Sequence, residues 1–292
     1  MGDGAPARDA PPVAGWRAGL RPTLRNRLVL FGVVLVLGLI TLALFAGVIA
    51  PYDPTEMKVV NALKAPSWAH PFGTDRFGRD VLSRTIYGSR IAFGVAISSI
   101  GMALAVGAAL GLIGGYFGGW PDVVIGRVMD IWFSFPTLIL AIAIAAMLGP
   151  GLDNAVLAIA VVYAPLFSRV TRGSVIAERA KDHVVAALGM GAGAPRIVFR
   201  HILPNIAAPL IVQASVSLAY AILTEASLSY LGLGTQPPDP SWGTMLNEGR
   251  TYLETAPWMS IFPGLAIMLA VLAFNLCGDG LRSVLDPQLR GR

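Results

Sequence analysis

Ionisable side chains recur at helical spacing in residues 74–90. Asp75 stands four residues before Arg79, and Asp80 stands four residues before Arg84. Oppositely charged side chains at this spacing pair on one face of a helix. We therefore predict an amphipathic helix here, whose charged side chains pair with one another in contact with water.

A second polar segment, ALGMGAGAPRIVFRHILPN at residues 187–205, stands between two long apolar runs. Its three glycines are expected to end one short helix. Pro195 suits the first turn of a second short helix over Arg196–Leu203, and Pro204 discourages its continuation. The pattern predicts a helical hairpin, with Val184, Val185 and Leu188 on one apolar face. Such a hairpin either lies on a membrane and orients its neighbours, or docks into a groove of a partner.

The residue types needed for catalysis do not converge in this sequence. His70, His183 and His201 lie in different segments without ligand spacing, and Cys277 is the single cysteine. No lysine follows a glycine, so the Gly-x-x-x-x-Gly-Lys-Ser/Thr motif for ATP phosphates is missing. We expect no enzyme activity, no directly bound cofactor and no metal site. A basic stripe with interleaved aromatic residues is also missing, which argues against nucleic acid as a partner.

The elements that position these residues are apolar. Of 292 residues, 55% are hydrophobic and 13% are charged, which is typical of an integral membrane protein. Six stretches lack Asp, Glu, Lys and Arg, and we predict an all-α fold with six transmembrane helices. These stretches are Leu28–Ala50, Ile91–Pro121, Ile131–Leu152, Asn154–Ser168, His201–Thr224 and Thr255–Gly278.

Six spans place both termini on one side of a membrane. If that side is cytoplasmic, 15 of the 22 Lys and Arg residues lie inside, as the positive-inside rule favours. The expected organisation is then a partly disordered cytoplasmic tail (1–26), a first transmembrane helix (27–50), an extracytoplasmic loop with the amphipathic helix (51–90), a core of five transmembrane helices (91–280) that includes the cytoplasmic segment 178–205, and a cytoplasmic tail (281–292).

Polar residues inside the expected spans are scattered. They could line a path across the membrane, or their side chains could simply bond to carbonyl groups of their own helices. The path-lining candidates are Ser134, Tyr163, Gln213, Ser217 and Tyr220.

Four other residues in the spans or at their ends draw attention. Glu225 ends the fifth span, where a carboxylate near lipid suggests function, although water at the outer mouth and a structural tie to a nearby loop explain it equally well. Arg127 and Asp130, three residues apart, predict a local ion pair. Pro136 predicts a kink in the third span.

The hairpin segment carries a family resemblance. Val185-Ala-Ala-Leu-Gly-Met-Gly191, followed after nine residues by His201-Ile-Leu-Pro204, resembles the "EAA" cytoplasmic loop of permease subunits of bacterial ABC importers. Val185 stands where Glu is usual and His201 where Ile is usual. Both departures, with the closing Arg-His-Ile-Leu-Pro-Asn, resemble the peptide and nickel branch.

Three further stretches are similar to the second permease of dipeptide and oligopeptide systems. They are FGTDRFGRDVLSR (72–84), EASLSYLGLG (225–234) and FNLCGDGLRSVLDPQLR (274–290). The resemblance implies a type I ABC importer permease in a bacterial inner membrane, forming half of a path for dipeptides or oligopeptides. Nickel, glutathione or another small solute remains an alternative cargo. A self-contained secondary transporter is less favoured because repeated halves are not evident.

The resemblance also implies partners. They would be a homologous permease in a heterodimer, two ATPase subunits that carry ATP and Mg, an extracytoplasmic substrate-binding protein, and membrane lipid. Asp75, Arg79, Asp80 and Glu225 become candidates for the outer surface or pore mouth. Residues 178–205 would couple to the ATPases through a short helix pair between spans four and five. The coupling candidates are Val185, Ala186, Ala187, Gly191, Pro195, Arg196, Arg200, His201 and Pro204.

Overall fold

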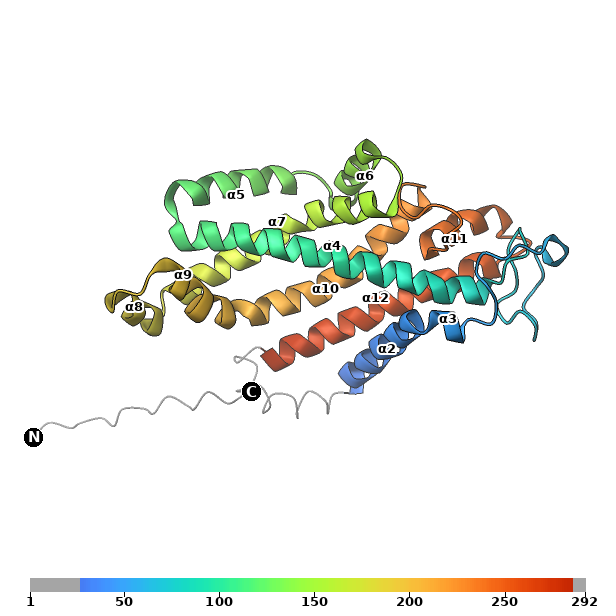
Figure 1. Cartoon of the computed structure of the whole chain (residues 1–292), viewed down its shortest axis with the longest axis horizontal. Helices are drawn as coiled ribbons and strands as arrows, with labels where there is room; N and C mark the ends of the chain where they lie inside the picture. Colours follow the sequence, from blue (N-terminus) through green and yellow to red (C-terminus); the bar gives the residue numbers. More distant parts are fainter. Residues whose placement is uncertain (1–26, 286–292) are drawn as a thin grey trace, which may run out of the picture.

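The chain forms an elongated bundle of helices (Figure 1). The computed structural model describes residues 27–285, so the tail predicted at 1–26 and residues 286–292 of the tail predicted at 281–292 lie outside the described residues. Short helices mark the two ends of the bundle, which we call the α8 end and the α11 end after α8 (Asp182–Gly189) and α11 (Trp242–Gly249). The long helices are α2 (Arg27–Leu44), α4 (Val81–Phe117), α7 (Leu152–Arg179), α10 (Leu203–Tyr230) and α12 (Trp258–Leu285).

Among the described residues, five helices are long and apolar enough to cross a membrane, counting α9 (Ala194–Ile197), the π-helical turn η2 (Val198–Ile202) and α10 as one. The pair α5 (Gly119–Phe133) and α6 (Thr137–Leu148) meets the same test together and is bent by 92°. If this pair is one span, the described residues hold the predicted six. The remaining short helices are α3 (Ala46–Ile49), η1 (Val59–Asn61) and η3 (Arg250–Tyr252).

The predicted kink in the third span is a complete break. Pro136 is the N-cap of α6, and the residue before a proline is driven out of the α conformation, so α5 ends before it. α5 begins at Gly119, earlier than the start expected for the third span at Ile131. The reason is that Gly118 and Gly119 adopt φ of 65° and 57° and turn the chain sharply after α4. Figure 1 shows α5 and α6 along one side of the bundle and α2 along the opposite side.

A row of glycines lets α4 pack closely on α7. Gly107, Gly111 and Gly115 are buried and four residues apart. A methyl group at Gly111 would come within 2.5 Å of the carbonyl oxygen of Ser168 and 2.6 Å of Cβ of Thr171. Small residues at this spacing allow close helix approach in membranes, where packing rather than the hydrophobic effect drives helix association. This row fixes α7 at the centre of the bundle.

The predicted amphipathic helix over residues 74–90 is wrong in its first part. Residues 74–80 form a turn closed by an isolated bridge between Thr74 and Asp80. Asp80 then caps α4, accepting a hydrogen bond from the backbone amide of Ser83 at 2.7 Å. Because Asp80 satisfies this free amide, the helix starts at Val81, and it continues without interruption into the second span.

The prediction that Pro204 ends the second hairpin helix is also wrong. The helix continues from Ala194 to Tyr230, and η2 ends at Ile202, two residues before the proline. The amide of Leu203 donates to the carbonyl of Val198, five residues back. This wider turn accommodates a residue that has no N–H and whose ring crowds the preceding turn.

Candidate functional site

The hairpin at the α8 end has the predicted glycine turn. Gly191 has a φ of 79°, and its amide donates to the carbonyl of Leu188 at 2.9 Å. The amide of Ala192 donates to the carbonyl of Ala187 at 3.1 Å, which completes the usual pair of bonds after a helix C-terminus. No atom lies within 4 Å of a Cβ added at Gly191. The glycine is therefore required by the backbone conformation and not by packing.

The apolar side chains of the hairpin divide into two sets. Val184 and Ala187 are buried together with Ile197 and Ile202, and they anchor the hairpin to the bundle. The predicted single apolar face is thus wrong, because Val185 and Leu188 point outward. The exposed apolar side chains of the hairpin are Val185, Leu188, Met190 and Phe199.

The coupling candidates lie mostly on the outside of this hairpin. Arg196 and Arg200 are exposed, and neither guanidinium has an ion-pair partner within residues 27–285. His201 is half-buried and Ala187 is buried, so these two support the hairpin from within. The exposed candidates are Val185, Ala186, Gly191, Pro195, Arg196, Arg200 and Pro204. This surface combines apolar side chains with unpaired positive charge.

At the α11 end, the charged residues predicted to be solvated are buried. Arg79 lies 2.5 Å from Asp75 and 2.7 Å from Glu248 of α11. Arg84 lies 3.5 Å from Glu248 and 3.7 Å from Asp75. The prediction of water-exposed pairing is wrong because Glu248, more than 160 residues away in sequence, brings a second carboxylate to the two guanidiniums.

Asp80 takes part in a separate buried arrangement. Besides capping α4, it accepts hydrogen bonds from the hydroxyl of Ser83 at 2.8 Å and contacts Nδ1 of His70 at 2.9 Å. Asp75, Arg79 and Asp80 therefore hold the 51–80 segment against α4 and α11, and they present little surface to a partner.

Glu225 is fully buried, at 0% exposure, and the expected contact with water at the outer mouth is wrong. Its Oε1 accepts hydrogen bonds from Ser229 at 2.7 Å and Thr235 at 3.4 Å. The contact with Thr235 is the tie to a nearby loop that the second alternative describes, since Thr235 belongs to the loop that follows α10.

Two of the five path-lining candidates come together. Tyr163 of α7 and Tyr220 of α10 line a cavity of about 510 Å³ between α6, α7 and α10. The hydroxyls of Tyr163 and Thr224 are 3.3 Å apart. The path-lining candidates did not include the other hydroxyls of this cavity, and it is the bend before α6 that brings Thr137 to it. The lining residues are Thr137, Leu138, Tyr163, Leu166, Tyr220, Leu223, Thr224 and Ser227.

The other three candidates do not line that cavity. Ser134 donates to the carbonyl of Ile131 at 2.6 Å, as the simpler alternative predicted. Gln213 donates to the hydroxyl of Ser217 at 3.2 Å on the same helix. All three side chains therefore find a hydrogen-bond partner within four residues in the sequence.

A second hollow, the α5–α7 groove, lies nearer the α8 end. Its lining residues are Asp122, Val123, Ile125, Gly126, Arg127, Met129, Asp130, Ser168, Arg169 and Arg172. The expected local pair of Arg127 with Asp130 is wrong, because Asp130 reaches across to Arg169 of α7 at 3.4 Å. Asp122 pairs with Arg172 of α7 in the same way. Both cross-helix pairs depend on α5 folding back along α7, which its own sequence does not indicate.

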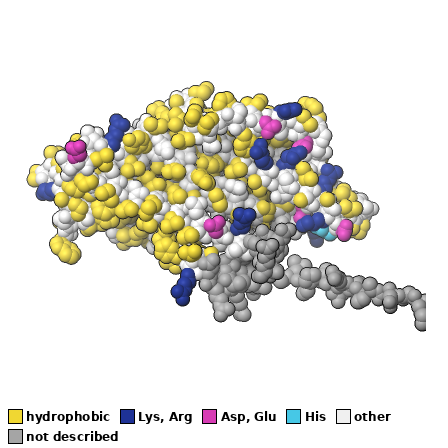
Figure 2. Space-filling view, turned by 180° about the vertical axis from the view of Figure 1, so that it is seen from behind, with side chains coloured by type: hydrophobic (Ala, Val, Ile, Leu, Met, Phe, Trp, Pro, Cys, Tyr) yellow, Lys and Arg dark blue, Asp and Glu magenta, His cyan; other side chains and the backbone are white. Residues whose placement is uncertain are grey.

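The surface of the bundle is divided between apolar and charged regions. Figure 2 shows hydrophobic side chains over much of the middle of one face, with most charged side chains toward the ends. This distribution suits a bundle that crosses a lipid bilayer along its long axis.

Comparison with known proteins agrees with this architecture. The family described as "Binding-protein-dependent transport system inner membrane component" matches residues 107–291. The N-terminal transmembrane domain of oligopeptide transport permease C matches residues 16–66. The fold is similar to that of the MetNI methionine ABC transporter in inward-facing conformations, with a TM-score of 0.56 at 20% identity, covering 70% of this chain and 97% of that chain.

Relatives in bacteria match almost the whole chain. The dipeptide transport system permease protein DppC of Alkalihalophilus pseudofirmus is 45% identical, over 95% of this chain and 91% of the relative. The di/tripeptide permease DppC of Pseudomonas aeruginosa is 47% identical, over 91% and 89%. The glutathione permease GsiD of Pectobacterium atrosepticum is 43% identical, over 97% and 94%. The resemblance read from the sequence is confirmed: the chain belongs to the family of binding-protein-dependent transport system inner membrane components, as a multi-pass permease subunit.

Proposed function

We propose that this chain forms half of the translocation path of an ABC importer for dipeptides or oligopeptides. The observation that carries the proposal is the outward face of the hairpin at the α8 end, where exposed apolar side chains stand on a rigid support beside arginines that have no ion-pair partner in the described part of the chain. Relatives named for dipeptide and di/tripeptide transport support the choice of cargo.

The hairpin is suited to receive force from a separate ATPase. Met190 is 82% exposed and Phe199 is 67% exposed, and such side chains fill a groove on a partner. Arg196 and Arg200 would pair with acidic residues at the rim of that groove. Because the sequence lacks a phosphate-binding motif, ATP and Mg are expected on the partner subunits and not on this chain.

The continuous helix from Ala194 to Tyr230 would carry the displacement inward. Ile197 and Ile202 are buried against the bundle, so a push on the hairpin cannot be absorbed by a flexible joint there. The same helix supplies Tyr220 and Thr224 to the cavity beside α7. ATP-driven closure of the ATPases would thus change the shape of this cavity, as alternating access requires.

The full assembly would contain a homologous permease, two ATPase subunits and an extracytoplasmic binding protein. The α8 end and both termini would face the cytoplasm, as the distribution of Lys and Arg favours. The cavity beside α7 has neutral hydroxyl groups and apolar walls, which suits cargo selected mainly by a separate binding protein.

The test is dipeptide uptake by the purified assembly in liposomes. Phe199→Ala should leave the permease pair intact, weaken its association with the ATPases, and lower uptake about tenfold, the effect of losing about 1.4 kcal/mol at a docking contact. The matched control is Phe45→Ala, an exposed phenylalanine between α2 and α3. Normal uptake and ATPase binding in Phe199→Ala would contradict the docking role.

A second candidate cargo is glutathione, which one relative is named for. Competition with unlabelled glutathione, nickel and dipeptides in the same liposomes separates these cargoes. Uptake driven by an ion gradient without any ATPase would instead favour a secondary transporter.

A further inference from the structure

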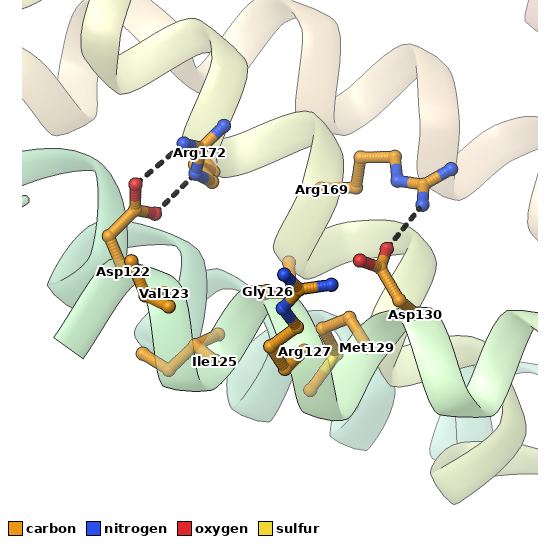
Figure 3. A pocket seen from close by; sticks show the side chains of 10 residues that line it. Asp122, Val123, Ile125, Gly126, Arg127, Met129, Asp130, Arg169 and Arg172 are labelled. Atoms are coloured by element: carbon orange, nitrogen blue, oxygen red, sulfur yellow. Dashed lines mark hydrogen bonds and ion pairs between the residues drawn. The ribbon is translucent and has the colours of Figure 1, made fainter. Parts of the chain in front are cut away.

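Five charged residues line the α5–α7 groove, and they belong to helices that form candidate spans (Figure 3). Asp122 and Asp130 of α5 pair across the groove with Arg172 and Arg169 of α7, and Arg127 lies between the two pairs. Within residues 27–285, Arg127 has no ion-pair partner. The groove has a volume of about 380 Å³, within the range of about 300–1,000 Å³ typical of small-molecule sites.

These charges argue that the groove contacts water. The side chains of Arg169 and Asp130 are 59% and 62% exposed, although they stand on helices that form candidate spans. Ionisable groups in spans face a bundle interior or a water-filled cavity, because exposing them to hydrocarbon is costly. The exposed apolar residues Val124 and Val128 do not line the groove and lie elsewhere on α5.

Gly126 keeps the groove open. It lines the groove, and a Cβ added there would meet no atom within 4 Å. Packing therefore does not require glycine at this position, in contrast to the buried glycines of α4. A larger side chain at Gly126 would enter the hollow itself.

The groove follows the hydroxyl-lined cavity along α7. Tyr163 and Leu166 line the cavity, and Arg169 and Arg172 line the groove. The four residues are three apart and form one slanting row on the helix surface. Cargo that moves along α7 toward the α8 end would meet hydroxyl groups first and charged groups next.

We propose that the α5–α7 groove is the second stage of the translocation path and is adapted to zwitterionic cargo, namely short peptides with a free ammonium and a free carboxylate. This inference rests on the proposed function. Asp122 and Asp130 would meet the ammonium group, and Arg127 would meet the carboxylate. Exposed ion pairs contribute only about 0–1 kcal/mol, and such weak binding lets cargo leave again.

The first arm of the test fills the groove. Gly126→Trp should assemble with its partners and hydrolyse ATP, but lose uptake of a labelled dipeptide in liposomes. The control is Gly101→Trp, because Gly101 on α4 also has no atom within 4 Å of an added Cβ and lines none of the described cavities. Normal uptake in Gly126→Trp would overturn the proposal. Loss of assembly would overturn it too, since the groove would then be a subunit interface.

The second arm removes charge without breaking a pair. Arg127→Gln should lower dipeptide uptake by up to about fivefold, the equivalent of about 1 kcal/mol. Arg250→Gln, at an exposed arginine of the α11 end, should leave uptake unchanged. Equal uptake in the two variants would overturn the assignment of the cargo carboxylate to Arg127.

The third arm does not depend on cargo. In a Cys277→Ala background, Gly126→Cys should react with a charged methanethiosulfonate reagent in membranes that hold the full assembly, whereas Val124→Cys should not. An unreactive cysteine at position 126 would overturn the proposal. If the wild-type assembly fails to take up dipeptide, the proposed function fails, and this arm alone still decides whether the groove is open to water.

Discussion

At the scale of single residues, the arginines at the α11 end show how this protein stabilises buried charge. Arg79 and Arg84 are both nearly inaccessible, and two carboxylates, Asp75 and Glu248, balance them. Neither guanidinium could be buried alone, because an unpaired buried charge costs several kcal/mol. The network therefore joins the 51–80 segment, the start of α4 and α11 into one unit.

Removing Glu248 tests this account. In Glu248→Ala, Arg84 keeps its hydrogen bond to the carbonyl of Pro54, but its one remaining ion-pair partner among residues 27–285 is Asp75, at 3.7 Å, so the assembly should lose about 3 kcal/mol of stability. Glu56→Ala is the control, since Glu56 and Lys58 form an exposed pair whose removal should cost no more than about 1 kcal/mol. Thermal unfolding of the purified assembly measures both. Equal midpoints for the two variants would show that the buried network does not stabilise the fold.

At the scale of elements, the glycine row of α4 decides how α7 is held. The hydropathy pattern of the sequence does not reveal this row, because glycine contributes little to an apolar pattern. Its effect appears only where Gly111 meets Ser168 and Thr171 of the facing helix. The row also fixes the lining of both hollows, because α7 contributes to the cavity and to the groove.

A leucine at Gly111 should force α4 away from α7. The expected loss is about 1–3 kcal/mol or more from overpacking, together with lower recovery of the assembly. Gly101→Leu places the same side chain on the same helix where no atom lies within 4 Å of its Cβ, and it should be tolerated. Thermal unfolding of the two proteins side by side gives the answer, and a similar midpoint for both would refute the role of the row.

The elements themselves were predictable to different degrees. Long charge-free stretches predicted the spans, because hydrocarbon imposes a length and a composition on any helix that crosses it. Local rules misjudged Pro204, where a π-helical turn lets the helix continue, and Pro136, where the chain breaks fully. Both outcomes depend on how neighbouring turns and helices accommodate a proline, which the local pattern does not record.

The contacts of the candidate sites were also predictable to different degrees. The glycine turn at Gly191 was predictable because its bonds are local. The partners of Arg79 and Asp130 were not, since Glu248 and Arg169 approach them only in the folded bundle. Convergence of Tyr163 with Tyr220 required the packing of α7 on α10, which no spacing within either helix reveals.

At the scale of the whole molecule, the two ends of the bundle differ in construction. The α11 end is closed by a buried charge network and by the hydrogen bonds of Glu225. The α8 end presents exposed apolar side chains on one hairpin, together with arginines that form no ion pair with any residue from 27 to 285. The α11 end is thus closed by contacts within this chain, whereas the α8 end presents a surface that is suited to contact with a partner.

This asymmetry predicts opposite placement of two exposed residues across the membrane. In a Cys277→Ala background, Trp68→Cys in the 51–80 segment should react with an impermeant thiol reagent added to intact cells, because its side chain is fully exposed at the α11 end. Met190→Cys should react only in inverted vesicles, since it is 82% exposed at the α8 end.

Co-expressed ATPase subunits should protect position 190 and leave position 68 reactive, because docking on the hairpin would cover the first residue and not the second. Reaction of both cysteines from the same side would contradict a bundle that crosses the membrane along its long axis. Failure of the ATPases to protect position 190 would contradict docking on the hairpin while leaving that topology intact.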